Sequence, residues 1–202
     1  MGSIFKGIKA ADARKDANYV IPCHIIAKIN ACRIGENRKG EGFFVVEMTT
    51  LYDCAPDKFR RGEYGHEVGE DVSHMMMQKH DSFLPNVKAM IANTLDMDPD
   101  DIGEEEALAI CNENEKNGPV QPLKNTIIEI VGRNQVTKKG GDFTVVNYKG
   151  EVKPSVLLSL WQEMEEDAPE DKPFSAEACA RKFFPDPTLA ELIENEDETD
   201  DD

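Results

Sequence analysis

The segment Leu123–Lys149 constrains the fold of this chain more than any other stretch. Its two arms are rich in Ile, Val, Thr, Phe and Tyr, which favour extended backbone, and a Lys-Lys-Gly-Gly-Asp turn joins them. Because glycines permit the positive φ of a tight turn, we predict a β-hairpin with a cationic tip. Side chains alternate along a strand, so Ile128 and Ile130 are expected to face a core. Glu129 and Arg133 then face a ligand or solvent.

Two earlier segments predict a second hairpin. Tyr19–Arg33 and Phe43–Tyr52 are dominated by β-branched and aromatic residues, and the turn between them carries Arg38 and Lys39. Because adjacent strand residues point to opposite faces, one of Phe43 and Phe44 is expected in the core and the other outside it. A third extended piece spans residues 67–80 and contains a run of three methionines, which predicts adaptable strand packing.

Helical periodicity replaces alternation after this third piece. Asp81 or Ser82 is a candidate N-cap, and the following helix has one apolar stripe: Val87, Met90, Ile91, Thr94 and Leu95. A short helix over Glu104–Asn112 is expected to turn Ala107, Leu108 and Cys111 inward. After the last hairpin, a further helical face is predicted from Val156, Leu157, Leu160, Trp161 and Met164, with Trp161 in the core.

The element order is therefore three strands, a helical region and two strands. This is the order of the OB-fold, a five-stranded Greek-key barrel that binds oligonucleotides or oligosaccharides. The predicted fold class is mainly β with helices (α+β), with the OB-fold domain over residues 19–161. An N-terminal arm, 1–18, precedes the domain. An acidic tail with short helices, 162–202, follows it, and its last eight residues, NEDETDDD, are expected to be disordered.

Charge is unevenly divided along the chain. The net charge is −17, but residues 162–202 hold 16 acidic and three basic residues, whereas residues 1–161 hold 24 and 20. The body is nearly balanced, and its cations are clustered in predicted loops. If the OB-fold is correct, Arg38-Lys39 and Lys138-Lys139 flank one groove, next to a loop that mixes cations with aromatic residues.

Single-stranded nucleic acid requires cations that follow its phosphates and aromatic faces on which its bases stack. The candidate nucleic-acid-binding residues are Arg38, Lys39, Phe43, Lys58, Phe59, Arg60, Arg61, Tyr64, Arg133, Lys138, Lys139 and Phe143. Simpler explanations exist for several of them. The Lys138-Lys139 turn is also typical of a soluble hairpin, and Phe59 and Tyr64 are equally suited to fixing their loop to the barrel.

Several other classes of function find no support in the sequence. The Cys and His residues have no zinc-site spacing, and neither a phosphate-binding glycine loop nor a GxSxG motif is present, so no catalytic site, metal or cofactor is predicted. Five widely spaced cysteines suit reduced thiols. No apolar run is long enough to cross a membrane. A cytoplasmic protein is expected, in a host cell if the chain is viral.

Three stretches resemble a known family. The run VGEDVSHMMMQKHDSFLPNVKAMIANTLD, the hairpin KKGGDFTVVNY and the acidic C-terminus resemble bacteriophage single-stranded DNA-binding proteins of the short-tailed-phage type. The likeness covers roughly Tyr19–Lys149. It implies an OB-fold whose groove binds single-stranded DNA in replication or recombination. It also implies an acidic tail that competes for the groove and docks replication proteins such as polymerase and helicase. Related tails often end in an aromatic residue, whereas this chain ends in three aspartates.

Two functions thus remain open from the sequence. The first is a single-stranded DNA-binding module with the residues named above. The second is an acidic interaction protein or DNA mimic on a β-barrel scaffold, for which the low pI of 4.6 is the reason. DNA or RNA preference and the oligomeric state do not follow from these residues.

Overall fold

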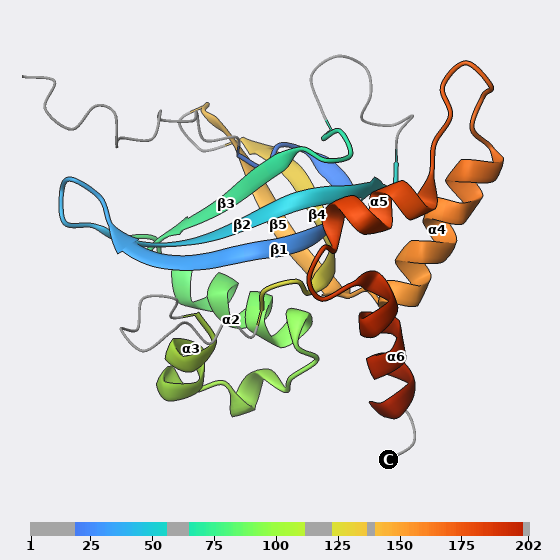
Figure 1. Ribbon diagram of the computed structural model, residues 1–202. Helices are drawn as coiled ribbons and strands as arrows, with labels where there is room; N and C mark the ends of the chain where they lie inside the picture. Colours follow the sequence, from blue (N-terminus) through green and yellow to red (C-terminus); the bar gives the residue numbers. More distant parts are fainter. Residues whose placement is uncertain (1–18, 56–64, 112–122, 137–139, 200–202) are drawn as a thin grey trace, which may run out of the picture.

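The computed structural model describes residues 19–55, 65–111, 123–136 and 140–199. Within these residues the chain is an α+β protein, with a five-stranded antiparallel sheet, five α-helices and one 3-10 helix. The predicted order of three strands, a helical region and two strands is confirmed. Figure 1 shows helices beneath the sheet and a second group of helices at one end of it.

The strands are long and follow the predicted segments. They are β1 (Cys23–Glu36), β2 (Gly42–Asp53), β3 (Asp71–Met77), β4 (Ile127–Val136) and β5 (Asp142–Glu151). They are hydrogen-bonded in the order β3-β2-β1-β4-β5, so the described strands form an open sheet with β3 and β5 at its edges. Strand β1 joins the two hairpins: it forms the first hairpin with β2 along most of its length, and its first part also pairs with β4 of the second hairpin. Two register irregularities interrupt the β1–β2 pairing, as β-bulges do where a strand bends.

The helices fall into two groups along the chain. The first lies between β3 and β4 and comprises α2 (Phe83–Thr94), a 3-10 helix (Pro99–Asp101) and α3 (Glu104–Cys111). The second follows β5 and comprises α4 (Pro154–Glu166), α5 (Ala176–Phe183) and α6 (Leu189–Thr199). In the part of the chain that the structure describes, no helix has both the length and the apolar character needed to span a membrane.

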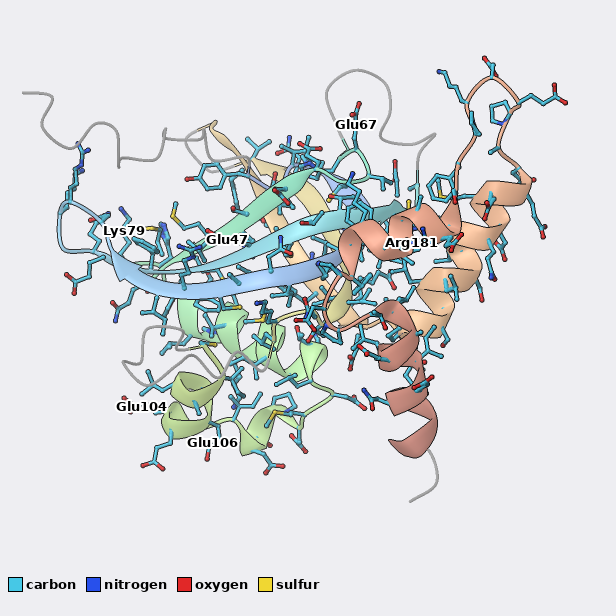
Figure 2. The ribbon with its side chains drawn as sticks, viewed as in Figure 1. Glu47, Glu67, Lys79, Glu104, Glu106 and Arg181 are labelled. Carbon is cyan, nitrogen blue, oxygen red and sulfur yellow. The ribbon has the colours of Figure 1, made fainter. Side chains whose placement is uncertain are left out.

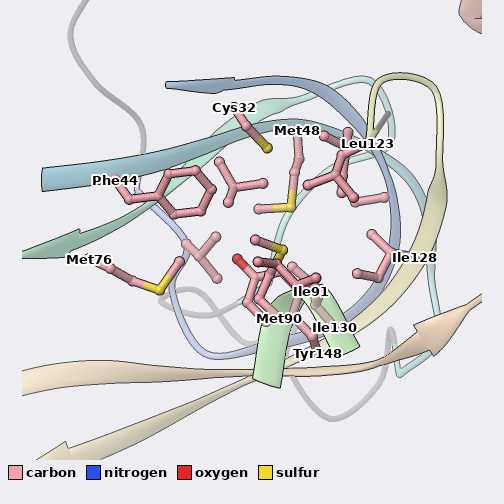
Figure 3. Close-up of a cluster of buried hydrophobic side chains, with 14 of the residues drawn as sticks. Cys32, Phe44, Met48, Met76, Met90, Ile91, Leu123, Ile128, Ile130 and Tyr148 are labelled. Atoms are coloured by element: carbon pink, nitrogen blue, oxygen red, sulfur yellow. The ribbon is translucent and has the colours of Figure 1, made fainter. Parts of the chain in front are cut away.

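The main core lies between the inner face of the sheet and α2. Ile128 and Ile130 of β4 are fully buried there, as their alternation predicts, and Phe44 rather than Phe43 is the inward aromatic of β2. Met90 and Ile91 of the α2 stripe are also fully buried. Figure 3 shows these side chains converging on one space between the strands and the helix. The alternation in the hairpin and the periodicity of α2 therefore identified these core residues correctly.

Two predicted core residues face solvent instead. Leu108 on α3 is 48% exposed and Val156 on α4 is also 48% exposed. Their neighbours Cys111, Leu157 and Trp161 are buried, so both helices pack along a narrower stripe than the periodicity predicts.

A second core lies on the outer face of the sheet. Ile26 of β1 points away from its inward neighbour Ile25 and packs with Leu51, Ile127 and the helices α4 to α6. Trp161 on α4 is fully buried there, and its indole N–H donates to the Leu51 carbonyl oxygen at 3.0 Å. The C-terminal helices are therefore fixed to the sheet by both apolar packing and a buried hydrogen bond.

The short helices predicted in the acidic C-terminal segment, over Ser175–Phe184 and Thr188–Glu194, are present as α5 and α6, and they pack against the sheet. Phe183, Phe184 and Leu189 are buried in the second core, and Lys28 donates a hydrogen bond to the Phe183 carbonyl oxygen. The Lys28 ammonium also lies 5.1 Å from the centroid of the Phe184 ring. Helix α6 continues to Thr199, into the segment for which composition predicted disorder. Apolar side chains from Phe174 to Ile193 thus contribute to the second core.

Candidate nucleic-acid interface

A cleft of about 730 Å³ lies where the two edges of the open sheet approach each other. One wall comes from β3 and the start of α2, and the other comes from the end of the β4–β5 hairpin. The described lining residues are His74, Met75, Met76, Met77, His80, Ser82, Phe83, Asn86, Gln135, Phe143, Thr144, Val145 and Val146. We call this the edge cleft.

A side-chain hydrogen bond joins the two edge strands. His74 on β3 and Tyr148 on β5 are hydrogen-bonded at 2.8 Å between Nδ1 and the hydroxyl oxygen, and their rings lie 5.7 Å apart between centroids. Asn93 of α2 also donates its side-chain N–H to the Tyr148 carbonyl oxygen at 2.9 Å. These contacts hold β5 near β3 through side chains and set the separation of the cleft walls.

Burial keeps both members of this link neutral at pH 7. Desolvation lowers the pKa of His74 from 6.5 to about 4 and raises the pKa of Tyr148 well above its usual value of 10. Neither group therefore brings a charge to the cleft at neutral pH. His74 can still offer a ring nitrogen, as donor or acceptor, to a ligand.

The β3 wall is apolar and adjoins the turn between β1 and β2. Met77 pairs with Phe43 in the sheet, and the Gln78 N–H donates to the Gly42 carbonyl oxygen at 2.9 Å. Lys79 forms an ion pair of 3.1 Å with Glu41 of that turn. The turn with Arg38 and Lys39 therefore lies next to the end of β3, on the side of the cleft formed by β3.

The hairpin wall carries the exposed aromatic residue of the cleft. Phe143 on β5 is 44% exposed and pairs with Gln135 of β4, while Arg133 pairs with Val145 two residues further along. Because alternate strand residues share a face, Arg133, Gln135 and Phe143 lie on one side of the hairpin. An exposed cation and an exposed aromatic ring thus lie within cross-strand reach of each other.

The structure describes five of the twelve predicted site residues. Arg38 and Lys39 are exposed in a turn held by Asn37, whose side-chain oxygen accepts from the backbone N–H groups of Lys39 and Glu41. Phe43 is half-buried, and its ring lies against Gly35, where an added Cβ would come within 2.8 Å of it. Arg133 and Phe143 are brought together on the hairpin. The other seven, Lys58, Phe59, Arg60, Arg61, Tyr64, Lys138 and Lys139, lie outside the described residues.

Sequence reasoning missed most of the cleft lining. Met75 and Met77 were assigned to strand packing, yet they line the cleft on the outer face of β3. His74 and Gln135 were given no role. Alternation along residues 71–77 was the available signal, because it places Met75 and Met77 on the same face as Phe43.

Electrostatically, the cleft differs from the rest of the chain. The sequence contains 40 acidic residues in 202, yet neither Asp nor Glu is among the described residues that line the cleft. Its polar groups are amides, hydroxyls and imidazoles, and its apolar groups include Phe143 and three methionines. Such a lining offers stacking and hydrogen bonding without repelling an anion.

Comparison with known proteins adds no family assignment. No protein-family model matches this chain, and no curated protein matches its sequence.

Proposed function

We propose that this chain binds single-stranded DNA in the edge cleft and so coats and protects it during phage-type replication or recombination. The observation that carries the proposal is that the described residues lining the cleft include no carboxylate, in a protein with a net charge of −17. A net negative charge repels a polyanion, so a cleft whose described lining has no acidic side chain provides a place where it can approach.

The lining also suits single strands better than duplexes. Phe143 and the methionines provide flat or adaptable apolar contacts for unstacked bases, and Asn86 and Gln135 provide amide groups for base edges. Arg133 next to Phe143, with Arg38 and Lys39 beyond β3, provides cations for phosphates. We further propose that the open sheet is a partly open OB barrel. In this barrel the side-chain hydrogen bond between His74 and Tyr148 would replace the backbone hydrogen bonds that would otherwise pair β3 with β5.

The acidic C-terminus fits this proposal as a competitor for DNA and a dock for replication proteins. Its docked helices bring carboxylates to the folded body, and the last helix, α6, ends in an acidic sequence. For the acidic end to compete with DNA for the edge cleft of the same molecule, α6 must detach from α4. This is because Leu189, at the start of α6, is buried in the second core.

A fluorescence-anisotropy titration with labelled oligo-dT tests the proposal. Phe143→Ala should lower the affinity by about 1–3 kcal/mol, which is roughly fivefold or more, because a stacking surface is lost. Val156→Ala is the matched control, since Val156 has a similar exposed fraction but lies on α4. Unchanged binding by Phe143→Ala would place the DNA elsewhere.

Charge reversal tests the contribution of the hairpin tip. Lys138→Glu with Lys139→Glu should weaken binding several-fold and reduce the dependence on salt, whose slope is about −0.7 for each phosphate neutralised. Lys124→Glu with Lys172→Glu changes the net charge equally at exposed sites away from the cleft lining. Equal losses in both double variants would mean that net charge rather than the site controls binding.

The acidic interaction protein is the alternative, and the same titration separates the two functions. The binding module should prefer oligo-dT to a duplex of equal length, whereas a DNA mimic should bind neither. The mimic is favoured by the pI of 4.6 and by the exposed carboxylates of α3.

A further inference from the structure

A second hollow, lined mainly by apolar side chains, lies on the other side of α2 from the edge cleft. It measures about 650 Å³ and is bounded by the ends of β1 and β2 and by α2 and α3. Its walls include Ile34, Phe44, Leu84, Val87, Ile102 and Leu108. We call it the helix groove. Phe83 lines both hollows, so the first turn of α2 separates them.

Large apolar side chains at the rim of the helix groove are exposed. Leu84 is 72% exposed, Leu108 is 48% exposed and Ile34 is 40% exposed. They come from α2, from the neighbouring helix α3 and from the distant strand β1, which meet around one hollow. Single exposed apolar residues need no explanation, but several around a concave apolar surface mark an interaction site.

The α3 side of the helix groove is negatively charged. Helix α3 begins with Glu104, Glu105 and Glu106, and the 3-10 helix before it contains Asp100 and Asp101, all of them exposed. Figure 2 shows Glu104 and Glu106 on α3, at the lower edge of the molecule. Among the described residues that line the groove itself, Lys88 and Glu104 are the charged ones. An occupant that also contacts α3 should therefore combine an apolar face with positive charges on the side that meets α3.

The described part of the chain does not supply such an occupant from a second copy. Among its helices, α2 and α5 contain Lys or Arg. Helix α2 itself forms a wall of the groove, and Ala176 and Phe183 of α5 are buried in the second core. The apolar faces of both helices are thus already in use.

We propose that the helix groove binds a basic amphipathic helix of a partner protein, with two or three apolar side chains inserted between Leu84 and Leu108. Helix-in-groove recognition uses anchors spaced at i, i+3 or i+4, and i+7, which suits a hollow of this size. The carboxylates of Glu104 to Glu106 then pair with Lys or Arg beside those anchors. An anionic membrane is a poor alternative because the same carboxylates repel it.

The test measures binding of the full chain to a fluorescein-labelled 18-residue peptide by fluorescence anisotropy. The peptide consists of Leu, Ala and Lys and has one apolar helical face. Leu84→Asp with Leu108→Asp should weaken binding at least tenfold. This double change makes the groove more acidic, so purely electrostatic binding would become tighter, and the two mechanisms predict opposite signs. Val156→Asp is the matched control, because Val156 is equally exposed on α4 and should leave binding unchanged.

Two further results decide the matter. Glu104→Gln, Glu105→Gln and Glu106→Gln together should weaken peptide binding and flatten its dependence on salt. Equal or tighter binding by the Leu84 and Leu108 double variant would overturn the proposal. Tenfold tighter binding of the peptide after removal of residues 1–18 would also overturn the proposal. That segment contains Ile4, Phe5 and Ile8 among lysines, so such a result would identify it as the occupant of the helix groove. The affinity for oligo-dT should stay unchanged in the double variant, so this proposal and the DNA-binding proposal can fail separately.

Discussion

Replacing His74 with Phe should make the stability of the chain less sensitive to mild acid. Burial lowers the pKa of His74 to about 4, whereas an unfolded chain leaves the imidazole at its ordinary value of 6.5. Between these two pH values the unfolded state binds a proton that the folded state does not. The free energy of unfolding therefore decreases as the pH falls from 6.5 towards 4, and the Phe variant lacks this contribution.

The size of the effect follows from the two pKa values. Each pKa unit corresponds to about 1.4 kcal/mol, so the contribution reaches about 2 kcal/mol at pH 5 and about 3 kcal/mol below pH 4. Above pH 7 it is absent. The many carboxylates of the chain also titrate in acid, but they do so equally in both proteins. The difference between wild type and His74→Phe isolates the imidazole.

Urea unfolding at pH 7.5 and pH 5, followed by tryptophan fluorescence, measures this difference. Trp161 is the single tryptophan of the sequence and is fully buried, so it reports on unfolding. Tyr148→Phe is the matched control: it removes the hydrogen bond to His74, which costs about 1 kcal/mol at either pH, but leaves the imidazole buried. Its pH dependence should equal that of wild type. Parallel pH dependence in wild type and His74→Phe would refute the assignment of this burial effect.

Two other predictions concern the C-terminal segment. Trp161→Ala should lower the free energy of unfolding by about 3–5 kcal/mol, because it leaves a cavity in the second core. Trp161→Phe keeps an aromatic ring and loses only the hydrogen bond to the Leu51 carbonyl oxygen, so it should cost far less. Thermal unfolding followed by circular dichroism compares the two variants. A small effect of Trp161→Ala would mean that α4 to α6 are not fixed to the sheet. Deleting residues 194–202 removes seven carboxylates and should tighten oligo-dT binding at low salt, with the difference vanishing near 1 M salt. Equal affinities at low salt would remove the acidic end as a competitor.

Local patterns predicted the strands and the main core well. Alternation in Ile128 to Ile130 and the apolar stripe of α2 each report on contacts within one element, and both are confirmed. The turn residues located both hairpins for the same reason.

Features that depend on contacts between distant elements could not be predicted. The link from His74 to Tyr148 joins residues 74 positions apart, and no local pattern marks it. The docking of the C-terminal segment was missed because its acidic composition outweighed Phe183, Phe184 and Leu189, whose partners Ile26 and Leu51 lie near the start of the chain. Leu108 was predicted to be buried and is exposed. Periodicity identifies an apolar position on a helix, but it does not show whether another element covers that position.

The second core also determines how this chain can be made and shortened. The buried side chains Ile26, Leu51 and Ile127 lie in three strands, and the helices that cover them follow all five described strands in the chain. A nascent or truncated chain that stops before α5 presents these side chains to water, so it should aggregate rather than behave as a trimmed domain. An expression boundary belongs after Ile193, beyond the last apolar residues of α6 that contact this core.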